Sequence, residues 1–150
     1  MVQFLRRLWT KLRESTNSSQ PNPDLINASE RISRYILSKR HFSSSNKVVK
    51  YGAYMPASNG EASSYRTSGL TELDIWLIGT EYVAKPRNKL LRARGDTTAA
   101  TITSLGLEVT PAPQPHPRHT NITNWPHEDS EKKLVAIELA NSATLELPPS

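Results

Sequence analysis

The sequence predicts an α+β fold in which a small, mainly antiparallel sheet packs against two or three helices. Two observations favour this class: short segments rich in β-branched and aromatic residues, and longer segments with apolar residues at helical spacing. The 150 residues, 36% of them hydrophobic, suffice for one modest core. We therefore expect one domain over residues 25–150, preceded by an N-terminal amphipathic helix over 1–14 on a flexible linker over 15–24.

The segment 1–14 has apolar residues at helical spacing, with basic residues on the flanks. Its candidate partner-binding residues are Phe4, Leu8, Trp9 and Leu12. Such a helix could dock on a protein partner or an anionic membrane surface, direct the chain to an organelle, or pack on its own domain. Its apolar stretch is too short to span a bilayer. The linker is predicted from its polar residues and its prolines.

The first part of the domain is predicted to form a helix followed by two strands. Asn27 and Glu30 form a capping-box pair, and a helical stripe of apolar residues follows to about Lys39. That stripe consists of Ile32, Tyr35 and Ile36. The segment 48–55 is rich in β-branched and aromatic residues and ends at a proline, which predicts a strand. We expect a weaker strand over 62–67, antiparallel to the first.

The segment 72–83 is predicted to be the central helix of the core. Thr71 is a suitable N-cap with Asp74 at the third helical position, and Leu70 can pack against Ile75. Apolar residues fall on more than one face of this helix, which predicts burial nearly all round. Gly79 interrupts the helix and indicates close approach by a neighbouring element.

The remaining segments complete the expected α+β pattern. We expect an edge strand over 89–94 with basic residues outward, a short helix from Asp96 through Ile102, and a brief strand over 107–110. Four prolines between 111 and 117 predict an extended crossing. Ile122 and Trp125 are expected to point inward.

The C-terminal segment is predicted to form the last helix and a terminal strand. The helix is expected from 129 or 130 to 143, with Leu134 and Ile137 buried, and the strand at Leu145 and Leu147.

The net charge is +5, and fifteen of the nineteen basic residues lie in three acid-free blocks, 1–13, 31–50 and 85–94. Such clustering is typical of proteins that bind a polyanion, and we favour a small basic nucleic-acid-binding protein. The alternative is a solvated basic surface. Candidate nucleic-acid or phosphate contacts are Arg31, Arg34, Arg40, Lys47, Lys50, Lys85, Arg87, Lys89, Arg92, Arg94 and Arg118. Tyr35, Tyr51, Tyr54 and Tyr65 could stack on bases.

A second hypothesis is a phosphodiester-directed enzyme. His116 and His119 could transfer protons near neutral pH, with Arg118 between them and Arg66 as a phosphate holder. The same histidines with His127 and Glu128 could bind a metal, although this spacing matches no known closed site. The third interpretation of these residues is that they are polar side chains on a proline-rich loop, with His119 bonded to backbone.

The sequence contains no phosphate-binding loop, no dinucleotide fingerprint and no zinc-protease motif, so no cofactor is predicted. It also contains no cysteine, which excludes disulfides and thiolate chemistry. We expect a cytoplasmic protein. A third functional hypothesis is an adaptor that docks to a partner or membrane surface through residues 1–14. The oligomeric state stays open.

Overall fold

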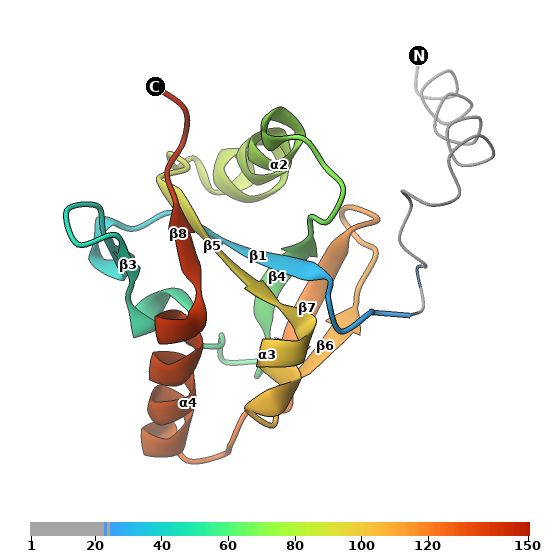
Figure 1. Cartoon of the computed structure of the whole chain (residues 1–150), viewed down its shortest axis with the longest axis vertical. Coiled ribbons are helices and arrows are strands. Elements are labelled where there is room, and N and C mark those ends of the chain that lie inside the picture. Colours follow the sequence, from blue (N-terminus) through green and yellow to red (C-terminus); the bar gives the residue numbers. More distant parts are fainter. Residues whose placement is uncertain (1–22, 24) are drawn as a thin grey trace.

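The computed structural model describes residue 23 and residues 25–150 (Figure 1). The helix predicted over 1–14, its four candidate contact residues and nearly all of the linker therefore lie outside the described residues. A six-stranded sheet with the order β6-β7-β4-β1-β5-β8 forms the centre. Every neighbouring pair is antiparallel, which confirms the predicted α+β class.

The strands of this sheet are β1 (Arg31–Ile36), β4 (Ala62–Arg66), β5 (Ala93–Thr98), β6 (Glu108–Pro111), β7 (His119–Thr123) and β8 (Thr144–Glu146). A small second sheet pairs β2 (Phe42–Ser43) with β3 (Val48–Val49). The α-helices are α2 (Glu72–Ile78), α3 (Ala99–Ser104) and α4 (Asp129–Ser142). Helix α2 continues as a π-helical turn, η3 (Gly79–Ala84), and a 3-10 turn, η4 (Lys85–Arg87). Two further 3-10 turns are η1 (Lys39–His41) and η2 (Tyr51–Ala53).

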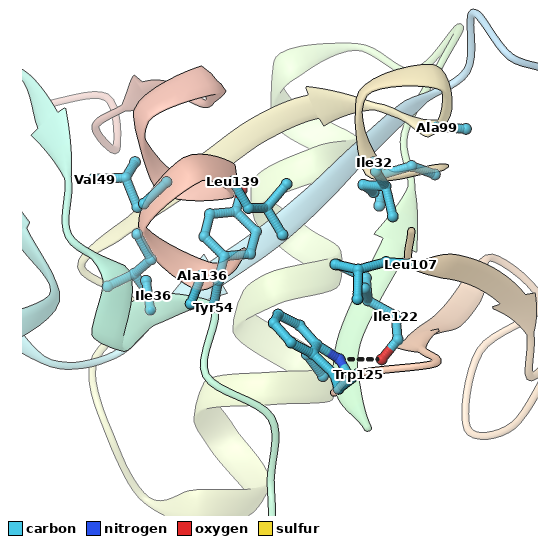
Figure 2. Close-up of a cluster of buried hydrophobic side chains, with 14 of the residues drawn as sticks. Ile32, Ile36, Val49, Tyr54, Ala99, Leu107, Ile122, Trp125, Ala136 and Leu139 are labelled. Carbon is cyan, nitrogen blue, oxygen red and sulfur yellow. Dashed lines mark hydrogen bonds between the residues drawn. The ribbon is translucent and has the colours of Figure 1, made fainter. Parts of the chain in front are cut away.

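Helices α3 and α4 cover one face of the sheet, and α2 covers the other (Figure 1). The larger core lies under α3 and α4 and includes Ile32, Ile122 and Leu139, all at most 1% exposed. Figure 2 shows these side chains together with Trp125, whose indole N–H donates to the carbonyl oxygen of Ile122 at 2.9 Å. A smaller cluster under α2 contains Tyr35, Tyr65, Ile75 and Ile78.

The predicted helix over 27–39 is wrong, because residues 31–36 form strand β1 in the interior of the sheet. Ile32 and Ile36 join the larger core while Tyr35 joins the cluster under α2, so the apolar stripe belongs to two faces of a strand. A strand buried on both faces loses the alternation that would distinguish it from a helix. The Asn27 N–H does donate to the Glu30 carboxylate, at 3.0 Å, but this bond closes a turn before β1.

Two of the other predicted strands also differ from the structure. In the segment 48–55 only Val48–Val49 forms a strand, and Tyr51–Ala53 turns back as η2. Strand β4 is confirmed, but it pairs with β1 and β7 instead of residues 48–55. The strand expected over 89–94 begins only at Ala93, and it lies between β1 and β8, so it is not an edge.

The predicted helix at 72–83 is confirmed, with the Thr71 hydroxyl accepting from the Asp74 N–H at 3.2 Å. Its predicted burial nearly all round is wrong, because Leu73 is 69% and Leu77 48% exposed. The close approach predicted at Gly79 is confirmed. A Cβ atom placed there would lie 2.5 Å from the ring of Tyr35.

Pro111 ends strand β6, and Pro113, Pro115 and Pro117 lie in the loop of the β6–β7 hairpin, so the predicted extended crossing is wrong. Helix α3 begins after its cap, Thr98, whereas Asp96, where the helix was expected to begin, lies within β5. The inward positions of Ile122 and Trp125 are confirmed.

Helix α4 and strand β8 are also confirmed. Helix α4 nevertheless buries Ala136, Leu139 and Ala140, and Leu134, expected inside, is 63% exposed.

Candidate functional site

Arg66, the predicted phosphate holder, is 1% exposed and lies on strand β4. Its Nε donates to Glu30 Oε1 at 2.5 Å, and its Nη2 donates to Glu30 Oε2 at 2.9 Å and to the Leu25 carbonyl oxygen at 2.8 Å. Strand alternation places Arg66 on the face opposite to Tyr65, and Tyr65 is the residue that contacts His119. The structure therefore does not bring Arg66 and His119 into one site.

Three more of the predicted phosphate contacts, Arg118, Arg31 and Arg94, form hydrogen bonds that stabilise the fold. Arg118 is buried and its Nη1 donates to the carbonyl oxygens of Arg66 and Ser68, at 3.0 and 3.2 Å. Arg31 donates to the hydroxyl and the carbonyl oxygen of Thr67, at 3.0 and 2.8 Å. Arg94 also makes contacts within the fold: it donates to the carboxylate of Glu72 and so connects β5 with α2.

The Arg94 guanidinium is buried between two carboxylates and an indole ring. It forms ion pairs with Glu72 at 2.9 Å and Asp96 at 3.0 Å, and it lies 4.8 Å from the ring centroid of Trp76. Hydrogen bonds from this guanidinium hold the pKa of Glu72 below its usual value. Arg94 is 1% exposed, and both carboxylates compensate its charge. It is therefore not available to bind a phosphate.

His119 has a defined tautomer because both ring nitrogens have partners. Its Nδ1 lies 2.8 Å from the carbonyl oxygen of Ala112, which can only accept, so Nδ1 carries the hydrogen. Its Nε2 lies 2.7 Å from the Ser63 hydroxyl, from which it accepts when the imidazole is neutral. This geometry agrees with the third interpretation of these residues, in which His119 is a polar side chain hydrogen-bonded to backbone. The Ser63 hydroxyl is an additional partner.

His116 is packed between two tyrosine rings, with ring centroids 4.8 Å from Tyr82 and 6.2 Å from Tyr65. Its Nδ1 accepts from the Arg118 N–H at 3.0 Å. Burial, with a smaller contribution from the Arg118 charge, lowers the pKa of His116 to about 4. This histidine is neutral near pH 7 and serves as an acceptor.

The alternative metal site is not formed in the part of the chain that the structure describes. No group of three or more His, Asp or Glu side chains there is placed to hold a metal ion.

Most of the remaining basic residues lie near one another in space. They belong to two segments, 34–50 and 87–92, which together line two surface pockets. The smaller of these pockets has a volume of about 240 Å³, and we call it the Arg34 pocket. It is lined by Arg34, Tyr35, Leu37, Ser38, His41, Ala53, Ser63, Tyr65, Val83, Arg87 and Lys89. Three of these residues, Arg34, Arg87 and Lys89, have basic side chains, and none is acidic.

Arg34 is held in place by two carbonyl oxygens instead of a carboxylate. Its Nε donates to Ala53 at 2.8 Å and its Nη1 to Ser63 at 2.7 Å. Among the described residues it makes no ion pair. Burial lowers the pKa of Arg34, and the nearby charge of Arg87 acts in the same direction. The pocket therefore contains a fixed positive charge that no acidic side chain compensates.

Two larger pockets extend this basic region. One, of about 500 Å³, is lined by Lys39, Lys50 and Arg92 together with the three serines at 43–45. The other, of about 530 Å³, is lined by Arg40, His41, Lys50 and Tyr51 together with part of α4. Lys50 lines both of these pockets and His41 also lines the Arg34 pocket, so the three pockets are neighbours.

The other two predicted contacts lie outside these pockets. Lys47 is exposed in the turn between β2 and β3, at a positive φ of 54°. Lys85 is paired with Glu81 at 3.3 Å. Sequence reasoning had not singled out Lys39 or His41, although both lie in the acid-free block 31–50 that could have indicated them.

Comparison with protein-family models, with curated protein sequences and with solved structures found no match. Within residues 23 and 25–150, no helix combines the length and apolar character needed to cross a membrane. The geometry of the pockets is therefore the basis on which a function can be assigned.

Proposed function

We propose that the protein binds nucleic acid through its basic surface, defined as Arg34, Lys39, Arg40, His41, Lys50, Arg87, Lys89 and Arg92. The observation that carries this proposal is the convergence of two acid-free segments, well separated in the sequence, on shared pockets without an acidic lining residue. Clustered cations that lack carboxylate partners are the electrostatic requirement for binding a phosphate backbone.

Aromatic exposure favours a single strand as the ligand. Tyr51 lines the same surface and is 40% exposed, and the Lys133 ammonium lies 4.9 Å from its ring centroid. An exposed ring beside cations is a platform on which an unpaired base can stack. Tyr35, Tyr54 and Tyr65, by contrast, are at most 5% exposed, so stacking on bases is left to Tyr51.

A titration of labelled single-stranded RNA, single-stranded DNA and duplex DNA at several salt concentrations tests this proposal. We expect affinity to fall steeply with salt, because each neutralised phosphate of a single strand contributes roughly 0.7 to the logarithmic slope. The double variant Lys50→Gln/Arg92→Gln should weaken binding and lower that slope by about 1.4.

The matched control is Lys85→Gln/Lys132→Gln, which removes the same charge from residues already paired with Glu81 and Asp129. Equal loss in the two double variants would mean that net charge alone attracts the ligand, and the assigned surface would be wrong. Absence of binding at low salt would reject nucleic-acid binding altogether.

The enzyme alternative keeps one supporting observation, the Ser63 hydroxyl bonded to His119 beside the Arg34 pocket. A shortened label in the titration that disappears in His119→Ala would favour it.

The adaptor hypothesis concerns residues outside the described part. A truncated protein lacking residues 1–20 tests it, through loss of recruitment with retained nucleic-acid affinity. A cytoplasmic location is part of the proposal, since nucleic acid is accessible there.

A further inference from the structure

The Arg34 pocket differs from its two neighbours in size. Its volume of about 240 Å³ is roughly half of theirs, about 500 and 530 Å³. Pockets for drug-sized ligands usually measure roughly 300 to 1,000 Å³. The Arg34 pocket lies below this range and has room for a fragment such as a phosphate group with its sugar.

The charge of the pocket exceeds what one internal phosphate requires. Arg34, Arg87 and Lys89 line it, and among the described residues none of the three is in an ion pair. A phosphodiester carries a single negative charge, whereas a phosphate monoester carries about −1.5 to −2 near pH 7. Three cations are therefore better matched by a phosphate monoester.

The hydrogen-bond donors of the pocket are arranged before any ligand arrives. The Arg34 Nε and Nη1 are held by two carbonyl oxygens, which fixes the plane of the guanidinium. Arg87 uses its Nη1 on the Val83 carbonyl oxygen, at 2.9 Å. The Ser38 hydroxyl oxygen accepts from the Arg40 N–H at 3.2 Å, so its own hydrogen can be donated elsewhere. Preorganised donors reduce the entropy cost of binding an anion.

We infer that the Arg34 pocket binds a terminal phosphate, the phosphate monoester at the end of a nucleic-acid strand that lies on the basic surface. This inference rests on the proposed function, and it adds that strand ends are preferred to strand interiors. A free mononucleotide presents the same chemistry, so the test separates the two sources.

The test compares three oligonucleotides of one sequence with an internal label: a 5′-phosphate, a 3′-phosphate, and hydroxyls at both ends. We expect one phosphorylated strand to bind at least about tenfold more tightly than the hydroxyl strand, since hydrogen bonds to charged groups have this magnitude. The double variant Arg87→Gln/Lys89→Gln should abolish that ratio. The double variant Lys50→Gln/Arg92→Gln should weaken the binding of all three strands. It should retain the ratio between the affinities of the phosphorylated and the hydroxyl strands.

Equal affinities for the three strands, with steep salt dependence, would overturn the inference and leave the proposed function intact. Direct binding of a mononucleotide or inorganic phosphate, measured by calorimetry, combined with no strand binding, would reject the proposed function and overturn the preference for strand ends in favour of a site for free phosphate groups. If neither strands nor mononucleotides bind, both conclusions fail. Circular dichroism of each variant verifies that the fold is retained.

Discussion

The guanidinium of Arg66 forms a bidentate ion pair with the carboxylate of Glu30, with N–O distances of 2.5 and 2.9 Å. Both side chains are buried, and the pair connects strand β4 to the turn before β1. A bidentate geometry satisfies the donors of the guanidinium and the acceptors of the carboxylate together. Arg66 is therefore a structural cation, although its position in the sequence also suited a phosphate contact.

Glu30→Gln removes the negative charge from this pair while retaining the size of the side chain. We expect the free energy of unfolding to fall by about 3 kcal/mol, because the buried, bidentate ion pair between Glu30 and Arg66 is broken. Urea denaturation measures this change. The control is Glu81→Gln, which breaks the exposed pair with Lys85 and should cost less than about 1 kcal/mol. Similar losses in the two variants would contradict the buried character of the Arg66 pair.

Tyr54→Phe is expected to leave stability unchanged or to raise it by about 1 kcal/mol. The Tyr54 hydroxyl is buried and has no hydrogen-bond partner among the described residues, and an unsatisfied buried hydroxyl is unfavourable. Tyr35→Phe is the matched comparison, because the Tyr35 hydroxyl donates to the Ile75 carbonyl oxygen. That variant should lose about 1 kcal/mol. Thermal or chemical unfolding that ranks Tyr54→Phe below Tyr35→Phe would show that the Tyr54 hydroxyl is bonded after all.

Gly79→Ala is expected to destabilise the protein although alanine is the better helix former. The new Cβ would lie 2.5 Å from ring carbons of Tyr35 and 2.8 Å from the Leu91 side chain. Overpacking of this kind costs about 1–3 kcal/mol, which outweighs the roughly 1 kcal/mol gained in helix propensity. Thr80→Ala, at the exposed neighbouring position, should change stability by less than about 0.5 kcal/mol. A Gly79→Ala protein as stable as the parent would mean that α2 can shift away from the sheet.

His116 is expected to make stability depend on pH between about 6.5 and 4. Its pKa is about 4 in the folded protein, whereas an unperturbed histidine has a pKa of about 6.5. Above pH 6.5 both states are neutral and the full stability is present. As the pH falls from 6.5 to 4, only the unfolded state takes up the proton, so folding stability is lost. Because His116 is partly exposed, we expect a loss on the order of 1–2 kcal/mol.

His116→Asn isolates this effect, since an amide oxygen can accept from the Arg118 N–H and does not titrate. Urea unfolding at pH 7 and pH 5 should show a smaller difference for the variant than for the parent. The carboxylates contribute equally to the pH dependence of stability in both proteins, so their effect cancels in the comparison. If the free energy of unfolding changes equally between pH 7 and pH 5 in both proteins, folding does not lower the pKa of His116.

Those features of the fold that depend on neighbouring residues could be predicted from the sequence. The start of α2 follows from the Thr71 cap, and α4 and the inward positions of Ile122 and Trp125 follow from local patterns. The acid-free blocks were only a partial guide to the basic residues. Lys50 and Arg92 do line a shared pocket, whereas Arg31 and Arg94 are used in contacts within the fold.

Features that depend on partners far along the chain were decided only by the tertiary structure. Strand β1 is buried on both faces by elements between residues 49 and 140, so its own pattern resembled a helix. The same holds for the arginines. Arg66 and Arg94 are neutralised by Glu30 and Glu72, which lie 36 and 22 residues away, whereas Arg34 has two carbonyl oxygens and no carboxylate. Charge in a sequence can be counted, but its compensation depends on which residues folding brings together.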